Sequence, residues 1–210
     1  MRNHLKIVSI LLTIISLVAG CATDPRARQV RPAFMDSAFK PEAVDKLVVL
    51  PVADLRRDLG VTLSAEKLDH MVFSPYPAIF SNPNAWRFEH RGYKEVVFLN
   101  KGQTRPTVSG DHLSEMKEDW IRSLGRDSDR WVLVVTLDDL SSANTFGSVV
   151  KASCSAYLVD KRSAKLAWRH SASVEVGFGG LAGLMGKGML ESGLPADCAS
   201  KLYWELPYRG

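Results

Sequence analysis

The three cysteines are the side chains of this sequence best suited to covalent chemistry. Cys21 ends an apolar leader, whereas Cys154 and Cys198 lie in the body of the chain. Cys154 alternates with polar residues along an expected strand, and Cys198 shares a helical face with Leu202, so both thiols should face a core. They form a disulfide there or remain two buried thiols, and the oxidising compartment indicated below favours the disulfide. A metal site is not expected, because no pair of histidines at ligand spacing accompanies them.

A glycine-rich segment, residues 177–188, invites comparison with a phosphate-binding loop, because it follows an expected strand and contains Gly186-Lys187. The comparison fails at two positions. The first glycine of such a loop would fall at Leu181, and Gly188 stands where Ser or Thr should bind the metal ion. We therefore expect this segment to be a flexible or close-packed connection between two elements.

Residue patterns typical of catalysis are not evident elsewhere. The histidines do not fall at metal-ligand spacing on one helix, and no serine lies in a Gly-x-Ser-x-Gly motif. Asp138-Asp139 follows an expected strand, where aspartates commonly form turns. The sequence thus predicts a protein that is not an enzyme and that needs neither a cofactor nor a metal.

The first 20 residues have the composition of a secretory signal. Arg2 and Lys6 form a cationic head, and residues 7–18 form an apolar run that is too short to span a bilayer. This run leads into Val18-Ala19-Gly20-Cys21, which resembles the lipobox of bacterial lipoproteins residue by residue. The resemblance implies that the chain is cut before Cys21 and that this cysteine is acylated. The alternative is an ordinary secretory signal with a chance cysteine.

The residue after Cys21 bears on the membrane in which the protein is anchored. In Gram-negative lipoproteins an aspartate there commonly retains the protein at the inner membrane, and this chain has Ala22 instead. We expect an outer-membrane anchor with the protein facing the periplasm, the inner membrane being the less favoured site. Without residues 1–20 the chain keeps 25 basic and 23 acidic residues, and this balance predicts no nucleic-acid partner.

The lipobox resemblance implies a signal at 1–20 and a lipidated cysteine at 21. A flexible tether is expected up to residue 44, and apolar periodicity begins in the expected periplasmic domain at 45–210. The proline and arginine content of the tether predicts an extended segment. The domain reads as β-α-β-α-β-β-β-α, an α/β (α+β) fold with a single mixed sheet of about five strands and helices packed on it. The expected strands are 46–52, 93–99, 131–137, 150–158 and 166–176, and the expected helices are 64–72, 111–124 and one that begins at Pro195.

Three of these segments also carry a resemblance. They are Val49-Leu50-Pro51-Val52, the strand Trp131–Val135, and the hairpin Ala156–Asp160 with Leu166-Ala167-Trp168. These segments resemble small envelope lipoproteins that share the α/β fold of the TolB amino-terminal domain and the curli-secretion lipoprotein. The resemblance implies a non-enzymatic module that docks on another envelope protein or assembles with its own copies. The long pore-forming hairpins of the curli lipoprotein are not evident in the sequence, so a secretion pore is not expected.

Two segments are candidate partner-binding surfaces. Residues 74–88 combine three prolines with Tyr76, Phe80, Trp86 and Phe88, a composition typical of restrained binding loops. An equally supported interpretation is that these rings cover one face of the sheet. The second is the glycine-rich segment. Its apolar residues either pack internally or face a partner or membrane: Leu181, Leu184 and Met185. The alternative function is a carrier or sensor of a small envelope ligand, such as a lipid or glycan fragment, in an apolar pocket under the glycine-rich segment.

Overall fold

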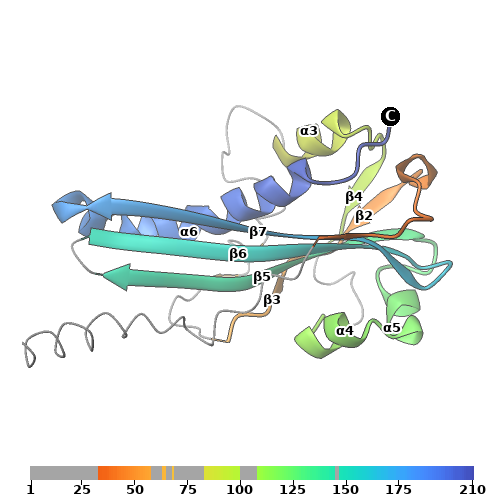
Figure 1. Cartoon of the computed structure of the whole chain (residues 1–210), viewed down its shortest axis with the longest axis horizontal. Coiled ribbons are helices and arrows are strands. Elements are labelled where there is room, and N and C mark those ends of the chain that lie inside the picture. Colours follow the sequence, from red (N-terminus) through yellow and green to blue (C-terminus); the bar gives the residue numbers. More distant parts are fainter. Residues whose placement is uncertain (1–32, 58–62, 65–67, 69–82, 100–107, 145–146) are drawn as a thin grey trace, which may run out of the picture.

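The computed structural model describes residues 33–57, 63–64, 68, 83–99, 108–144 and 147–210. These residues form a single mixed β-sheet with helices packed on both faces, which confirms the expected fold class (Figure 1). The sheet has seven strands in the order β1-β7-β6-β5-β2-β4, with β3 paired to β5 outside this path. The strands are β1 Phe34–Met35, β2 Leu47–Val49, β3 Ala53–Asp54, β4 Val96–Phe98, β5 Trp131–Asn144, β6 Gly147–Asp160 and β7 Lys165–Gly179. The two strands beyond the expected five, β1 and β3, have two residues each and are too short to leave a periodic pattern.

Helix α6, Gly180–Trp204, lies along one face of the sheet together with α3, Pro83–His90 (Figure 1). Helices α4, Gly110–Glu115, and α5, Glu118–Ser123, cover the opposite face near the start of β5. A 3-10 helix, η1, spans Pro41–Ala43. Two apolar cores result, one on each side of the sheet. Strand β2 shows why: Leu47 and Val49 contribute to the α6 core and Val48 to the other, as the alternation of side chains along a strand requires.

The expected helix at 111–124 is interrupted. Met116 adopts a left-handed conformation with φ of 47°, and its backbone N–H donates to the His112 carbonyl, which ends α4. Helix α4 begins at the N-cap Ser109, whose side chain accepts a hydrogen bond from the His112 N–H. The break separates two short helices that each bury apolar residues against the same core. Gly125, with φ of +63°, follows the end of α5 as the sequence predicts.

The expected start of the last helix at Pro195 is wrong, because α6 begins 15 residues earlier and Pro195 lies inside it. The glycine-rich segment is therefore mostly helical and not a connection. The leucine, methionine and alanine residues among its glycines are strong helix formers, and one proline removes only one backbone donor from a helix of 25 residues. The expected loop at 74–88 is also partly wrong, since α3 begins at Pro83, a favoured first helical residue. Of the expected helix at 64–72 only residues 64 and 68 are described.

Residues 33–44, expected to belong to a flexible tether, pack on the sheet. Strand β1 pairs antiparallel with the Trp168 and Arg169 edge of β7, and the Asp36 N–H donates to the Ala167 carbonyl at 2.9 Å. Val44 is buried in the α6 core. The packed region thus begins at least ten residues before the expected boundary at residue 45, which leaves a shorter segment between the domain and Cys21.

Candidate functional site

Strands β5, β6 and β7 have 14, 14 and 15 residues, whereas the other strands have two or three. At about 3.3 Å per residue, a strand of this length spans about 45 Å. Strand β2 pairs only with the beginning of β5, and β4 pairs with β2 on its other side. The three long strands therefore extend well beyond both (Figure 1). We call this extension the ribbon and define it as residues 138–144, 147–155 and 170–179.

Both edges of the ribbon lack a neighbouring strand among the described residues. On the β5 side, β3 pairs with Thr136 and Leu137 and goes no further. On the β7 side, β1 pairs with Trp168 and Arg169 only. Between these edges β6 pairs with both neighbours along its length. The ribbon therefore presents two parallel-running edges, one from β5 and one from β7.

Sequence reasoning placed the end of β5 at residue 137, which is wrong because the strand continues to Asn144. The register shifts between Leu137 and Asp139, so that Asp138 forms a β-bulge. The Asp138 carboxylate accepts hydrogen bonds from the Thr136 and Ser155 hydroxyls. The pair Asp138-Asp139, which resembles a turn signal in the sequence, thus lies within a strand, and the Thr136 and Ser155 side chains hold Asp138 there. The same finding shows that the hairpin of β5 and β6 is longer than the sequence indicates.

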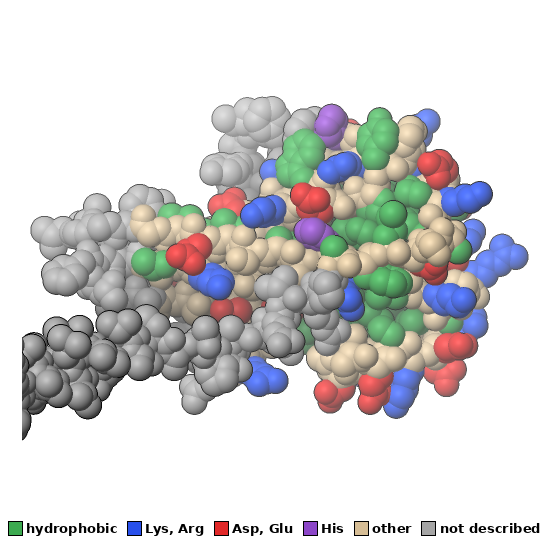
Figure 2. All heavy atoms as spheres, in the orientation of Figure 1, with side chains coloured by type: hydrophobic (Ala, Val, Ile, Leu, Met, Phe, Trp, Pro, Cys, Tyr) green, Lys and Arg blue, Asp and Glu red, His purple; other side chains and the backbone are tan. Residues whose placement is uncertain are grey.

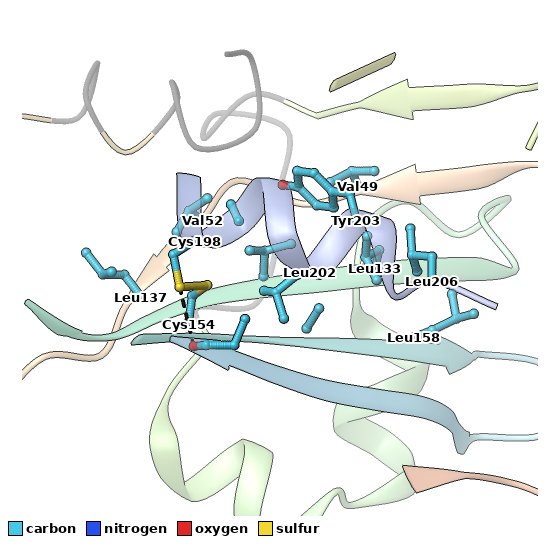
Figure 3. Packing of buried hydrophobic residues seen from close by; sticks show 14 of the residues in the cluster. Val49, Val52, Leu133, Leu137, Cys154, Leu158, Cys198, Leu202, Tyr203 and Leu206 are labelled. Carbon is cyan, nitrogen blue, oxygen red and sulfur yellow. Dashed lines mark hydrogen bonds between the residues drawn. A yellow bond between two sulfur atoms is a disulfide. The ribbon is translucent and has the colours of Figure 1, made fainter. Parts of the chain in front are cut away.

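The predicted disulfide between Cys154 and Cys198 is present and joins β6 to α6 (Figure 3). Both residues are fully buried, and their Cα atoms are 6.2 Å apart. Cys154 lies where the ribbon joins the body of the sheet, next to the apolar side chains under α6. The bridge therefore holds α6 against the base of the ribbon.

The two faces of the ribbon differ in chemistry. The face under α6 carries buried apolar side chains such as Leu140, Val150 and Ala152. The opposite face carries a group of serines that pair across β6 and β7: Ser153 with Ser173, and Ser155 with Ser171. The Ser155 and Ser171 hydroxyl oxygens are 2.8 Å apart. Helices α4 and α5 do not reach this face (Figure 1), although Ser155 on it is buried.

The described residues contain no group of three or more His, Cys, Asp or Glu side chains that could hold a metal ion. Each of the three described histidines contacts a tryptophan. His112 stacks on Trp120, His170 stacks beside Trp168, and the ring of His90 lies edge-on to Trp204. These contacts give the three imidazoles a packing role.

Of the predicted partner-binding side chains, the structure describes that of Phe88 alone. Phe88 is fully buried, with its ring 5.9 Å from that of Phe98 and 4.8 Å from that of Tyr203. It belongs to the core between the sheet, α3 and α6, so its proposed exposure is wrong and the alternative interpretation holds for this residue. The Phe88 backbone is helical, which turns the side chain toward the sheet.

The other predicted site residues are only partly described. Tyr76, Phe80 and Cys21 lie outside the described residues. For four further residues the structure places the backbone in a helix but does not describe the side chain: Trp86 in α3, and Leu181, Leu184 and Met185 in the first half of α6. That half of α6 lies over the ribbon (Figure 1). None of the described helices is long and apolar enough to cross a membrane.

The sequence matches no family model and is not closely similar to any curated protein. Solved structures with a partly similar arrangement include bacterial lipoproteins. The PelC dodecamer from Paraburkholderia phytofirmans is 12% identical with a TM-score of 0.46, over 85% of this chain and 97% of that chain. Lipoprotein GNA1162 from Neisseria meningitidis is 20% identical with a TM-score of 0.41, over 74% and 98%. The LpoB C-terminal domain from Salmonella enterica is 9% identical with a TM-score of 0.34, over 67% and 87%. At such scores the likeness is partial and transfers no function to this chain.

Proposed function

We propose that this chain is a periplasmic lipoprotein, anchored in the outer membrane through acylated Cys21, that acts as a non-enzymatic docking module of an envelope complex. The leader and the Val18-Ala19-Gly20-Cys21 motif support the anchor. Two acyl signals on one residue make such an attachment stable, whereas a single chain binds only weakly. Residues 22–32 span at most about 40 Å when fully extended, so the folded domain stays within that distance of the membrane.

The observation that carries the docking function is the ribbon, whose two edges have no strand partner among the described residues. Unpaired strand edges present backbone donors and acceptors to which another strand can add. The ribbon has an edge on each side, from residues 138–144 and from residues 170–179. An envelope protein that adds a strand to either edge would be held by backbone hydrogen bonds. A second copy of this chain is the other occupant that the edges admit.

The β7 edge carries features that restrict non-specific pairing. The Lys201 ammonium donates to the Ser173 carbonyl at 3.4 Å, and Glu175 is exposed two residues further along the edge strand. Charged side chains at an edge discourage aggregation with unrelated strands. A genuine partner must displace Lys201 from Ser173 and offer a group that complements Glu175. This requirement supports a selective docking edge.

Photo-crosslinking in cells tests the proposal. A photoreactive residue would replace exposed Glu175 on the β7 edge or exposed Ser141 on the β5 edge, and Glu89 on α3 serves as the matched control. We expect an adduct with one envelope protein from an edge position and none from Glu89. Adducts between copies of this chain would identify self-assembly. The absence of any specific adduct at both edges would refute docking through the ribbon.

A separate experiment tests the anchor. Mass spectrometry of the mature amino-terminal peptide should find Cys21 acylated, and Cys21→Ser should release the protein from the membrane fraction. Density-gradient separation of the envelope should place the native protein with the outer membrane. Recovery of an unmodified Cys21 in the periplasmic extract would show an ordinary secretory signal instead.

A further inference from the structure

A pocket of about 320 Å³ lies at the end of the sheet opposite the ribbon. It opens between the segment that follows β1 and the turn that joins β6 to β7. Figure 2 shows several Lys and Arg side chains on this end of the molecule. The residues that decide its chemistry are Phe39, Lys40, Arg130, Trp131, Asp160 and Lys165.

The inner wall of the pocket is apolar. The Phe39 and Trp131 rings are 5.5 Å apart, and Ala43 and Ala167 complete this wall. The Trp131 indole N–H already donates to the Ala43 carbonyl at 3.0 Å. The wall therefore offers hydrophobic contact and no free indole donor, so polar recognition depends on the charged side chains around it.

The two carboxylates of the pocket are occupied by internal hydrogen bonds. Asp160 accepts from Nε and Nη2 of Arg130, each at 3.2 Å, and from the Arg162 N–H at 3.0 Å. Burial alone would raise the pKa of Asp160, but the bonds from Arg130 and Arg162 outweigh it and lower that pKa. Asp36 accepts from the Ala38 N–H at 2.9 Å. Asp160 is thus paired within the protein, and the three cations of the pocket, Lys40, Arg130 and Lys165, outnumber its two carboxylates.

The cationic side chains of the pocket are less completely engaged in interactions within the protein. Arg130 is held by Asp160 and by its position 4.9 Å above the Trp131 ring, so its guanidinium is fixed while Asp160 engages only two of its three nitrogens. Lys40 and Lys165 are exposed, and neither forms an ion pair with a described carboxylate. The fixed Arg130 guanidinium and the exposed ammonium groups of Lys40 and Lys165 favour the binding of an anion.

We infer that this pocket binds a small anion, a carboxylate or phosphate that carries a short apolar group. The apolar group lies against Phe39 and Trp131, and the anionic group contacts Lys40, Arg130 and Lys165. The volume is at the lower end of the range for small-molecule sites, which suits a ligand of this size. Because the pocket and the ribbon lie at opposite ends of β7, this site is independent of the docking edges.

Titration of the isotopically labelled protein with hexanoate, hexyl phosphate and hexanamide tests the inference. Hexanamide keeps the shape of hexanoate and removes its charge. We expect hexanoate or hexyl phosphate to shift the NMR signals of the Trp131 indole and the Ala167 amide, with the tighter of the two identifying the anionic group. Hexanamide should bind at least about tenfold more weakly than the tighter anion.

A matched pair of variants locates the charge. The double variant Lys40→Gln/Lys165→Gln should weaken anion binding about tenfold, and Lys94→Gln, an exposed lysine elsewhere, should leave it unchanged. These lysines are solvent-exposed, so the variants should fold, and unchanged amide spectra without ligand would verify this. Binding of hexanamide as tight as that of the tighter anion, an unaffected double variant, or no shift at about 10 mM ligand would each overturn the inference.

Discussion

Replacing both Cys154 and Cys198 with alanine should lower the free energy of unfolding by about 4 kcal/mol. The two residues are 44 positions apart, and closing a loop of this length removes about that much chain entropy from the unfolded state. Both side chains are fully buried, so loss of the two sulfur atoms adds a small packing cost in the same direction. With a urea dependence of about 2 kcal/mol per molar, the unfolding midpoint should fall by about 2 M.

The assay is urea unfolding of the oxidised native protein and of the Cys154→Ala/Cys198→Ala variant, followed by circular dichroism. Alkylation of the native protein under denaturing, non-reducing conditions serves as its control, since neither residue should be modified. A midpoint shift of less than about 0.5 M would refute the assigned role of the bridge. Two alkylated thiols would show that the bridge itself does not form.

Three further changes test the packing described above. Phe88→Ala should cost about 3–5 kcal/mol of unfolding free energy, because the ring fills the core between the sheet and α6. A urea midpoint close to that of the native protein would show that Phe88 is not part of the core. Trp131→Phe removes the hydrogen bond to the Ala43 carbonyl and should lower the free energy of unfolding by about 1 kcal/mol. It should also speed proteolysis within residues 33–44, and an unchanged cleavage rate would show that other contacts hold this segment. The pKa of Asp160 is lowered in the folded state, so its pairing with Arg130 stabilises the fold above the ordinary aspartate pKa and is lost as the pH falls below it. Urea midpoints between pH 6 and pH 3 should therefore fall less steeply for Asp160→Asn than for the native protein, and identical slopes would contradict the pairing.

The central part of the fold is predictable because its strands are buried on both faces. Continuous apolar runs such as Leu47–Val49 and Trp131–Val135 are recognisable without any partner, since most positions of a doubly covered strand are apolar. The hairpin of β6 and β7 is recognisable for a different reason, its strict alternation around Cys154. These patterns depend only on neighbours along the chain, and the structure confirms them.

The ribbon escaped prediction because its continuation depends on side chains from different strands. Asp138 and Asp139 are poor strand residues in isolation, and the strand passes through them because Thr136 and Ser155 donate hydrogen bonds to the bulged Asp138. The break at Met116 is similar, because a left-handed methionine is unfavourable locally and is offset by the packing of α4 and α5 on one core. Contacts of this kind leave no trace in periodicity.

The candidate sites differ in how far a sequence can reveal them. That Cys154 and Cys198 both face a core follows from alternation and helical spacing, and an oxidising compartment favours their pairing. The structure decides between a disulfide and two buried thiols. The aromatic composition around Phe88 could not separate a binding loop from a core helix, because both bury rings, and only the helical backbone decides between them. The pocket at Lys40 and Lys165 is still less visible in the sequence. Its walls come from segments near residues 40, 130 and 160, which are about 90 and 30 residues apart and meet only when residues 33–44 pack beside β5 and β7. A binding site assembled across such separations is a property of the topology, and it therefore becomes available for inference only once the sheet order is known.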